Sequence, residues 1–389
     1  MTPICLHNGT VLTGFAAMER CAVLVEDGTI TDVFSKKRFE QKHFAPDVRI
    51  IDVQEAYIAP GFIDTHIHGF GGYGTDDAST ESVLEMSERL TSCGVSAFNP
   101  TLYPQESEEM LLAVANVAAA IGRESGAKIM GLHLEGPFLS ATKLGVQRPE
   151  TIRPVDINYM EQLWEAAEGH IVNMTVAPEL KGMREMALFC IKKGIVLQAG
   201  HTDAQYENMV EGMQVGILHS THLFNAMSKL DHRNPNAVGT ILIHPEMSCE
   251  IIADGAHVHP DLFKLLLRDK PIDKIVLITD GLKPTAQLEG PFFANGEEVV
   301  FHDGVFHRKL DDVIAGSGLT MIRGVKNLVS FGFSLEDAVK AASTNPAQVM
   351  RYRQKGTIIP GNDADITVFD KNFTVQASMV GGMLKYNNL

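Results

Sequence analysis

Between residues 57 and 281 the chain alternates short apolar runs with longer helical patterns, and this alternation limits the possible folds more than any other feature. Strands that are buried on both faces and separated by helices form a parallel sheet. Eight such runs fit in the region: YIAPGFIDTHIH, VSAFNPT, KIMGLHLEG, IVNMTVAP, GIVLQAGH, GILHSTHLFN, SCEIIADG and KIVLITDG. Eight strand–helix units predict an α/β fold, a closed (β/α)8 TIM-like barrel, rather than an open sheet.

The two ends of the chain do not show this alternation and are rich in short strand patterns. Residues 1–57 hold short strand patterns with turn residues between them, such as CAVLVEDGTITDVFS with its Asp27-Gly28 hairpin signal. After Ala315, two helical patterns, TMIRGVKNLVSFG and SLEDAVKAASTNPAQVM, precede a strand-rich tail that begins at GTIIPGNDADITVFD. We expect residues 1–57 and 356–389 to pair in one small β-sandwich domain, and residues 58–355 to form the catalytic barrel.

The charge and the cysteines exclude several classes of protein. With a formal net charge of −15, the chain lacks the positive surface that nucleic-acid binders need. Its five cysteines are far apart and form no C-x-x-C pair, which argues against a disulfide framework or a structural zinc knuckle. The N-terminus shows no export signal, and no apolar window reaches the length of a membrane span. We therefore expect a soluble cytoplasmic protein without a membrane or nucleic-acid partner.

Histidines and carboxylates recur where the predicted strands end. His66 and His68 end the first strand with one residue between them, so their side chains share a face. The ends of four other strands carry Glu135, His201, His222 and Asp280. Active sites of (β/α)8 barrels lie at these C-terminal strand ends. A ligand set of nitrogen and oxygen without cysteine predicts a hydrolytic Zn²⁺ or Fe²⁺ site with open positions for water.

These donors allow one or two divalent ions per chain. A carboxylate has two oxygens, so Glu135 can bridge an ion on His66 and His68 to a second ion on the other two histidines. Asp280 is the expected proton shuttle, because a carboxylate beside an activated water can take its proton and deliver it to a leaving nitrogen. A sixth ligand or a strand-end cap is the alternative role of Asp280.

Other histidines are not expected to bind the metal. His219 is three residues before His222, and strand alternation turns it to the opposite face. His133 shares the face of Glu135 but lies one layer deeper, which favours a hydrogen-bonded inner residue. We expect the histidines outside the strand ends at the surface: His7, His43, His170, His302 and His307.

A set of longer motifs carries a family resemblance: PGFIDTHIHG, GLHLEGPF, AGHTDA, THLFNAM, IIADGAHV and ITDG. In this order and spacing they resemble the amidohydrolase superfamily and, within it, the N-acetylglucosamine-6-phosphate deacetylases. The likeness covers nearly the whole chain. It implies a metal-dependent hydrolase of amino sugar catabolism that removes the acetyl group from N-acetyl-D-glucosamine 6-phosphate, giving D-glucosamine 6-phosphate and acetate.

Residue by residue, the resemblance implies a metal centre at the same strand ends. Glu135, His201 and His222 match the family's metal ligands, and Asp280 matches its catalytic acid/base. In KLGVQRP, Gln147 stands where some members carry a histidine that polarises the acetamide carbonyl. Those members tend to lack the first-strand His-x-His and use one metal. We therefore expect Gln147 at the substrate and a second ion, on the first-strand histidines, in the Lewis-acid role.

The resemblance also implies contacts with the sugar phosphate. Asn225 and Ala226 match positions that touch it, Ala226 through its backbone, and His257 matches a substrate-binding histidine. Arg233 matches an arginine that reaches the phosphate of the neighbouring subunit, which implies a homodimer. A chain of this negative charge needs a local cation for a dianionic phosphate, and the planar guanidinium of arginine binds one in a bidentate manner.

Three alternatives stay open on the sequence alone. N-acetylgalactosamine 6-phosphate differs from the expected substrate in one hydroxyl orientation, and a cyclic amide, as in dihydroorotase-like relatives, undergoes the same chemistry. A non-enzymatic scaffold on a dead barrel predicts lost ligands, yet every expected ligand is present. The segment GLKPTAQLEGPFF, residues 281–293, is expected to border the pocket with contacts that the sequence does not assign.

Overall fold

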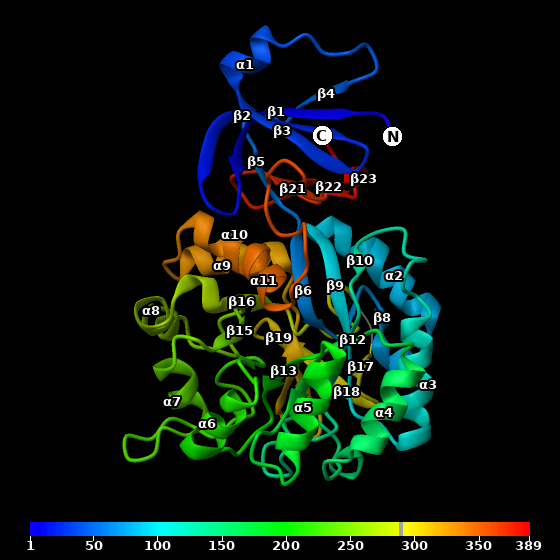
Figure 1. Cartoon of the computed structure of the whole chain (residues 1–389), viewed down its shortest axis with the longest axis vertical. Helices are drawn as coiled ribbons and strands as arrows, with labels where there is room; N and C mark the ends of the chain where they lie inside the picture. The colour runs from blue at the N-terminus through cyan, green and yellow to red at the C-terminus, as the bar shows by residue number, and fades with distance from the viewer. Residues whose placement is uncertain (288–290) are drawn as a thin grey trace.

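The computed structural model describes residues 1–287 and 291–389; residues 288–290, within the 281–293 segment, lie outside the described part. The chain forms a large α/β body and a small β-sheet body, which follow one another along the long axis of the molecule (Figure 1). Both termini lie in the small body. Across the described residues, no helix is both long enough and apolar enough to cross a membrane.

The large body is the expected barrel of eight parallel strands. Their order around the barrel follows the sequence, and backbone hydrogen bonds of 2.9 Å from His68 N to Gly281 O and from Asp280 N to His66 O join the last strand to the first. The strands are β6 (Phe62–Ile67), β9 (Val95–Leu102), β11 (Leu132–Glu135), β12 (Ile171–Val176), β13 (Val196–Ala199), β14 (His219–Ser220), β15 (Ser248–Ile252) and β16 (Ile275–Ile278). The short β10 (Lys128–Ile129) precedes β11. The prediction of a (β/α)8 barrel is confirmed.

The first predicted strand, YIAPGFIDTHIH, is two strands. Its first half, β5 (Tyr57–Pro60), pairs with strands of the small sheet, and its second half is β6. Gly61 separates them, and a Cβ at this position would collide with the side chain of Ser96. Because β6 starts at the small body, its C-terminal end, with His66 and His68, lies at the far end of the strand.

Helices cover the outside of the barrel. In α2 (Thr80–Leu90), Ser79 caps the N-terminus by accepting a hydrogen bond from Ser82 N, and Val83, Met86 and Leu90 form the buried stripe. The other helices are α3 (Ser107–Ala118), α4 (Ile157–Ala166), α5 (Met183–Lys193), α6 (Tyr206–Gln214), α7 (Asn236–Ile243), α8 (Pro260–Asp269), α9 (Met321–Ser330), α10 (Leu335–Ala342) and α11 (Thr344–Val349). The two helical patterns predicted after Ala315 are α9 and the pair α10–α11.

The two ends of the chain form the small body together, as predicted. Its strands pair in the order β23-β22-β21-β5-β1-β2-β3, with β4 beside β1. Residues of both halves pack into one hydrophobic core, which includes Leu6, Val23, Ile366 and Met379, so the sheet folds over on itself as a sandwich. The expected domain boundaries at residues 57 and 355 stay a prediction. Its elements are β1 (Ile4–Leu12), β2 (Ala17–Glu26), β3 (Thr29–Ser35), α1 (Lys36–Gln41), β4 (Arg49–Asp52), β21 (Ile366–Phe369), β22 (Val375–Val380) and β23 (Met383–Asn387).

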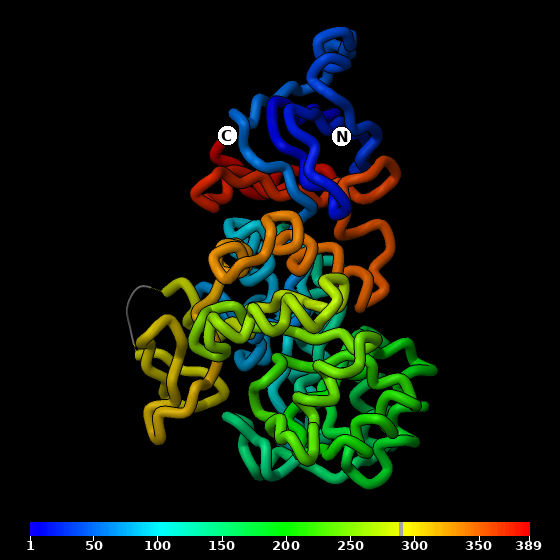
Figure 2. The backbone as a smooth tube through the Cα atoms, turned by 90° about the vertical axis from the view of Figure 1, so that its left-hand side faces the viewer, coloured from blue at the N-terminus to red at the C-terminus, as the bar shows by residue number. Residues whose placement is uncertain are grey.

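A third group of strands was not expected from the sequence. An antiparallel meander follows the last barrel strand, and Figure 2 shows it in yellow on one flank of the barrel. Its inner residues Ala294, Val299 and Phe306 pack on Tyr103 and Leu282 at the barrel mouth. The meander consists of β17 (Phe292–Ala294), β18 (Glu297–His302), β19 (Val305–Arg308) and β20 (Ile314–Ser317). Separately, a short antiparallel hairpin of β7 (Gly69–Phe70) and β8 (Tyr73–Gly74) follows β6.

Candidate metal centre

The structure brings the six strand-end residues together. Glu135 lies at the centre of the group: its Oε1 is 3.1 Å from Nε2 of both His201 and His222, and its Oε2 is 3.4 Å from Nε2 of His68. All six residues are more than nine-tenths buried, because the barrel walls enclose the strand ends. Residues up to 214 positions apart thus meet, as the order of the strands around a closed barrel requires. The six are His66, His68, Glu135, His201, His222 and Asp280.

Within this cluster two groups of three could each hold an ion. The donor atoms of His66, His68 and Asp280 lie within 4.8 Å of one another, and so do those of Glu135, His201 and His222. Asp280 Oδ1 is 3.5 Å from His66 Nε2 and 3.4 Å from His68 Nε2. Glu135 contacts both groups, because its Oε1 lies 3.1 Å from His201 Nε2 and 3.5 Å from His66 Nε2, and its Oε2 lies 3.4 Å from His68 Nε2.

Three of the imidazoles are held so that Nε2 faces the centre. His66 Nδ1 donates to Glu250 Oε2 at 3.0 Å, and His68 Nδ1 donates to the carbonyl of Thr101 at 3.1 Å. His201 Nδ1 donates to the carbonyl of Lys143 at 2.9 Å. Because Nδ1 carries the proton in each ring, the lone pair of Nε2 is free to bind a cation.

The cluster fits a divalent cation. His66 Nε2 is buried and has no hydrogen-bond partner among the described residues. Nε2 of His201 and Nε2 of His222 lie 3.2 Å apart, a separation at which two lone pairs repel unless a proton or a cation lies between them. Four imidazole nitrogens and two carboxylates without sulfur are typical ligands of zinc or iron at hydrolytic sites.

Mutual electrostatics keeps the carboxylates of the cluster charged. Burial alone would raise the pKa of Asp280, but the neighbouring His66 and His68 outweigh it and lower this pKa to about 2. Burial likewise opposes ionisation of Glu135, yet the imidazole of His201 and the hydrogen bonds from the rings around it hold its pKa well below the usual value. Both groups are therefore anions over the whole physiological pH range.

Several residues of the centre have strained backbone conformations. His201, Ala226 and Asp280 have φ angles of 45°, 48° and 49°, in the left-handed region that side chains with a Cβ rarely adopt. At Asp280 this conformation is held on both sides, because its N–H donates to His66 O at 2.9 Å and its C=O accepts from Ser317 N at 3.0 Å. Residues in such conformations cluster at functional sites, where the surrounding structure compensates their cost.

A cavity opens above the cluster and contains most of the predicted substrate residues. Gln147 Nε2 donates to Glu135 Oε2 at 2.7 Å, while the Oε1 of Gln147 is buried and has no hydrogen-bond partner among the described residues. His257 is fixed by Asp254, which lies 2.6 Å from its Nδ1. The lining includes His68, Glu135, Gln147, His201, His222, Asn225, Ala226, His257 and Asp280, together with Tyr103 and residues 313–315 of the meander side.

Comparison with known proteins identifies the family of this chain. The family model described as "Amidohydrolase family" matches residues 57–385, which span the barrel and the last strands of the small sheet. The chain belongs to the amidohydrolase family. Its cluster of histidines and carboxylates thus occupies the strand ends of an amidohydrolase barrel.

The relatives of this amidohydrolase include sugar-phosphate deacetylases. It is 33% identical to N-acetylglucosamine-6-phosphate deacetylase of Bacillus subtilis, over 93% of this chain and 92% of the relative. It is 28% identical to N-acetylgalactosamine-6-phosphate deacetylase of Escherichia coli O157:H7, over 87% and 90% of the two chains. A solved structure of an N-acetyl-D-glucosamine-6-phosphate deacetylase mutant from Mycobacterium smegmatis, in complex with N-acetyl-D-glucosamine-6-phosphate, superposes with a TM-score of 0.92 at 27% identity and full coverage of both chains.

Arg233 is the predicted site residue that this amidohydrolase chain does not bring to the cavity. It lies in an exposed loop after Met227, where its N–H donates to Asp231 Oδ1 at 2.8 Å. It is not among the lining residues that the structure describes. The predicted contact between Arg233 and the substrate phosphate of a neighbouring subunit stays a prediction.

The predicted orientation of His219 is wrong, whereas His133 lies as expected. His219 Nε2 is 3.8 Å from Glu250 Oε1 inside the barrel, not on the outer face. Strand β14 ends at Ser220, so strict alternation does not extend from His219 to His222. His133 is buried one layer below Glu135, where its ring bonds to the hydroxyls of Thr101 and Thr175 at 3.0 and 2.9 Å.

Sequence reasoning missed two residues of this centre. Glu250, within the apolar run SCEIIAD, supports His66; a lone carboxylate inside a buried strand was the available signal. The ring of Tyr103 stacks on His68 with a centroid distance of 3.7 Å and an interplanar angle of 2°. Tyr103 directly follows β9, and its position after a strand end was the corresponding signal.

A third group of potential ligands lies in the meander. His302, His307 and Asp312 have donor atoms within 4.8 Å of one another. The two rings stack, with centroids 3.7 Å apart and an angle of 11° between the planes. A metal binds in the plane of an imidazole, and two parallel planes at this separation do not share one ion. Asp312 Oδ1 instead bonds to His302 Nε2 at 3.2 Å, which makes the group a surface hydrogen-bond cluster.

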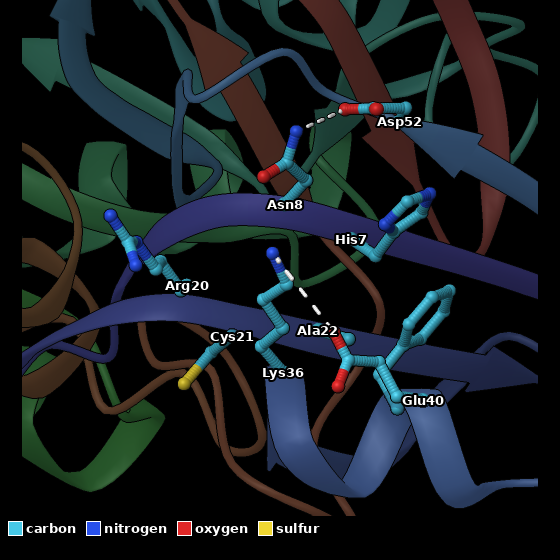
Figure 3. Close-up of a pocket in the computed structure, with 9 residues that line it drawn as sticks. His7, Asn8, Arg20, Cys21, Ala22, Lys36, Glu40 and Asp52 are labelled. Atoms are coloured by element: carbon cyan, nitrogen blue, oxygen red, sulfur yellow. Dashed lines mark hydrogen bonds and ion pairs between the residues drawn. The ribbon is translucent and has the colours of Figure 1, made fainter.

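A second cavity lies in the small body and has a different chemistry (Figure 3). Its polar side chains pair with one another: Asn8 donates to Asp52 Oδ1 at 2.8 Å, and Lys36 Nζ lies 4.0 Å from Glu40 Oε1. Within the described residues, none of the possible metal-binding groups includes a residue of this cavity. The barrel mouth is therefore the candidate active site.

Proposed function

We propose that this amidohydrolase removes the acetyl group from N-acetyl-D-glucosamine 6-phosphate and releases D-glucosamine 6-phosphate and acetate. The observation that carries the proposal is the meeting of a His/His/Asp and a Glu/His/His group beneath a cavity that Gln147, Asn225 and His257 line. Support also comes from the names of the relatives and from the substrate bound in the structure from Mycobacterium smegmatis.

The residues of the cluster hold one or two divalent cations, Zn²⁺ or Fe²⁺, and the two separate groups favour two. Such a cation supplies a Lewis acid and lowers the pKa of a water that it binds to about 7. Asp280 accepts the proton of the attacking water at a carboxylate oxygen and delivers it to the leaving nitrogen. Because the pKa of Asp280 is lowered, its carboxylate is ionised at neutral pH and carries no proton before the reaction.

The cavity residues orient the sugar. Asn225 and His257 offer hydrogen bonds, and the backbone of Ala226 a further contact, beside the cluster. Gln147 keeps one buried oxygen without a protein partner, which suits a contact with substrate. Arg233 binds the phosphate in the site of the partner subunit, so that the active form is a homodimer. This homodimer acts in the cytoplasm. Remote binding of the phosphate then positions the acetamide at the cluster.

The direct test of this reaction is acetate release from N-acetyl-D-glucosamine 6-phosphate by wild type and by Asp280→Asn. Replacing the carboxylate with an amide keeps the size of the side chain but removes the proton acceptor, and we expect a loss of about 10²–10⁴-fold in kcat. Equal rates in the two proteins would remove Asp280 from the mechanism. His170→Asn changes an exposed residue and is the control.

A second candidate substrate is N-acetyl-D-galactosamine 6-phosphate, because the relative from Escherichia coli O157:H7 is named as a deacetylase of this compound. Assays of both sugar phosphates side by side separate the two. We expect the larger kcat/KM for the glucosamine compound, and a larger value for the galactosamine compound would reverse the assignment. Hydrolysis of a cyclic amide at a rate above both would indicate a dihydroorotase-like activity.

A further inference from the structure

Glu250 is a buried carboxylate below the metal centre. It lies in the middle of β15 (Ser248–Ile252), its exposed fraction is 0%, and the residues on both sides of it in the strand are buried as well. A carboxylate at such a position is costly unless every oxygen is hydrogen-bonded. It is neither a candidate ligand nor a substrate contact, and the role described so far is that of the acceptor behind the ring of His66.

Both oxygens of Glu250 are engaged. Oε2 accepts from His66 Nδ1 at 3.0 Å and from the backbone N–H of His222 at 3.3 Å, and Oε1 accepts from Gln198 Nε2 at 3.2 Å. The first two partners belong to different groups of the cluster: His66 to the group with Asp280, His222 to the group with Glu135. Glu250 therefore joins the two halves of the centre from below.

The hydrogen bond to Glu250 selects one tautomer of His66. With the proton on Nδ1, Nε2 presents its lone pair to the space where it lies 3.5 Å from both Asp280 Oδ1 and Glu135 Oε1. With the proton on Nε2, the Nδ1 lone pair would face a carboxylate oxygen at 3.0 Å, which is repulsive. A carboxylate behind a ligating imidazole also increases the basicity of the ring.

We propose that Glu250 is a positioning residue that fixes the metal-facing tautomer of His66 and so determines the affinity of the His66/His68/Asp280 group for its ion. The inference rests on the two-ion form of the proposed function. It assigns to Glu250 no contact with substrate. In the other group, Lys143 O holds His201 and Gln147 holds Glu135, and the side chain of Glu250 contacts only the backbone N–H of His222, not its ring.

The test measures Zn²⁺ binding to the full-length protein after removal of bound metal by a chelator, using elemental analysis and competition with a chromophoric chelator. We expect two ions in the wild type. In Glu250→Leu one of the two should bind about 10–100-fold more weakly. Glu250→Gln retains an acceptor oxygen for His66, and its affinity should lie between those of the other two proteins. His66→Asn should weaken the same ion.

Asn99→Ala is the matched control for loss of a buried polar group in the same barrel. Its side chain bonds to Asn173 and to Tyr352, at 3.1 and 2.7 Å. It should lower the unfolding temperature, as Glu250→Leu does, but leave both Zn²⁺ affinities unchanged. A merely structural role of Glu250 would give this same result and would overturn the inference.

The number of ions bound by the wild type distinguishes failure of this inference from failure of the proposed function. Two ions in the wild type with unchanged affinities in Glu250→Leu overturn the inference alone. A single ion that His66→Asn leaves unaffected contradicts the two-ion form of the function and overturns the inference with it. If a single ion does depend on His66, the same comparison with Glu250→Leu decides the inference for that ion.

Discussion

At the scale of single residues, the centre depends on the direction of ring nitrogens. In His66, His68 and His201, Nδ1 donates a hydrogen bond on the outer side of the ring, so that Nε2 is directed toward the carboxylates of the centre. The acceptors behind these rings are a side chain in one case and backbone carbonyls in the other two. Substitution of a ligand therefore removes a donor whose orientation the barrel has already set.

The double substitution His66→Asn with His68→Asn tests the number of ions. It removes both nitrogen donors of one group and leaves Glu135, His201 and His222 intact. We expect the metal content of protein purified without chelator to fall from two ions per chain to one, and acetate release to fall with it. One ion per chain in the wild type, with full activity in the double variant, would refute the two-ion centre.

At the scale of elements, a largely buried lysine links the C-terminal segment of the chain to the strands beside it. Lys355, in the turn between α11 and β21, lies 2.6 Å from Asp365 Oδ2 and 2.9 Å from Asp363 Oδ2. Asp365 in turn accepts from Gly381 N at 2.8 Å, and its carbonyl accepts from Gly61 N at 2.9 Å. The pair thus lies where barrel and small body meet.

Lys355→Met should destabilise the protein by about 3 kcal/mol, because it leaves a buried carboxylate without its partner. Burial alone would lower the pKa of Lys355, but Asp365 and Asp363 outweigh burial and raise it above its usual value of 10.5. The contribution of the charged pair is therefore complete below pH 10.5 and is lost as the pH rises through the folded pKa. Thermal unfolding at pH 8 and above pH 10.5 should show a large difference from wild type that shrinks at the higher pH.

The control for this element is Lys309→Met. Its partner Glu298 is 2.6 Å away, but both side chains are about half exposed, at 58% and 41%. Exposed pairs contribute about 0–1 kcal/mol, so this variant should unfold close to the wild-type temperature. A similar loss in both variants would show that burial of the Lys355 pair adds nothing.

The barrel was predictable from the sequence because its strands are buried on both faces and therefore read as continuous apolar runs. The meander was not, since its strands are short and carry charged residues such as Glu297, Glu298 and Arg308. The Asp303-Gly304 pair between β18 and β19 was a hairpin signal within it. Local pattern alone could find the meander only through this turn.

The same distinction holds for the centre. Six strand-end residues could be predicted to meet, because a closed barrel brings all its strand ends to one mouth. Glu250 could not be assigned to His66, from which it is separated by 184 positions, since that contact depends on the register across the barrel interior. The contact of Arg233 cannot be checked within one chain, because its predicted partner is the substrate phosphate in the site of a neighbouring subunit.

At the scale of the whole molecule, the proposed homodimer makes each active site depend on two chains. Mixing two inactive variants tests this dependence. Asp280→Asn keeps Arg233, and Arg233→Ala keeps Asp280, so a mixed dimer contains one site with both residues if Arg233 acts across the interface. After unfolding and refolding of equal amounts together, we expect about a quarter of wild-type activity at low substrate concentration.

Each variant refolded by itself is the control for this mixture. If Arg233 acts within its own chain, the mixed dimers contain no intact site and the mixture should be no more active than the average of the two controls. That result, or a protein that sediments as a monomer in the presence of substrate, would contradict the shared site.

The pairing of β5 with β21 also has a consequence for synthesis of the protein. The first strands leave the ribosome early, but β21 to β23 emerge only after the entire barrel sequence has been translated. Until then one edge of β5 has no neighbour and the apolar face of the N-terminal strands lacks its cover, a state in which β-sheets associate with other chains. A nascent chain that stalls before its last 25 residues should therefore depend on chaperones even though its catalytic centre is already encoded.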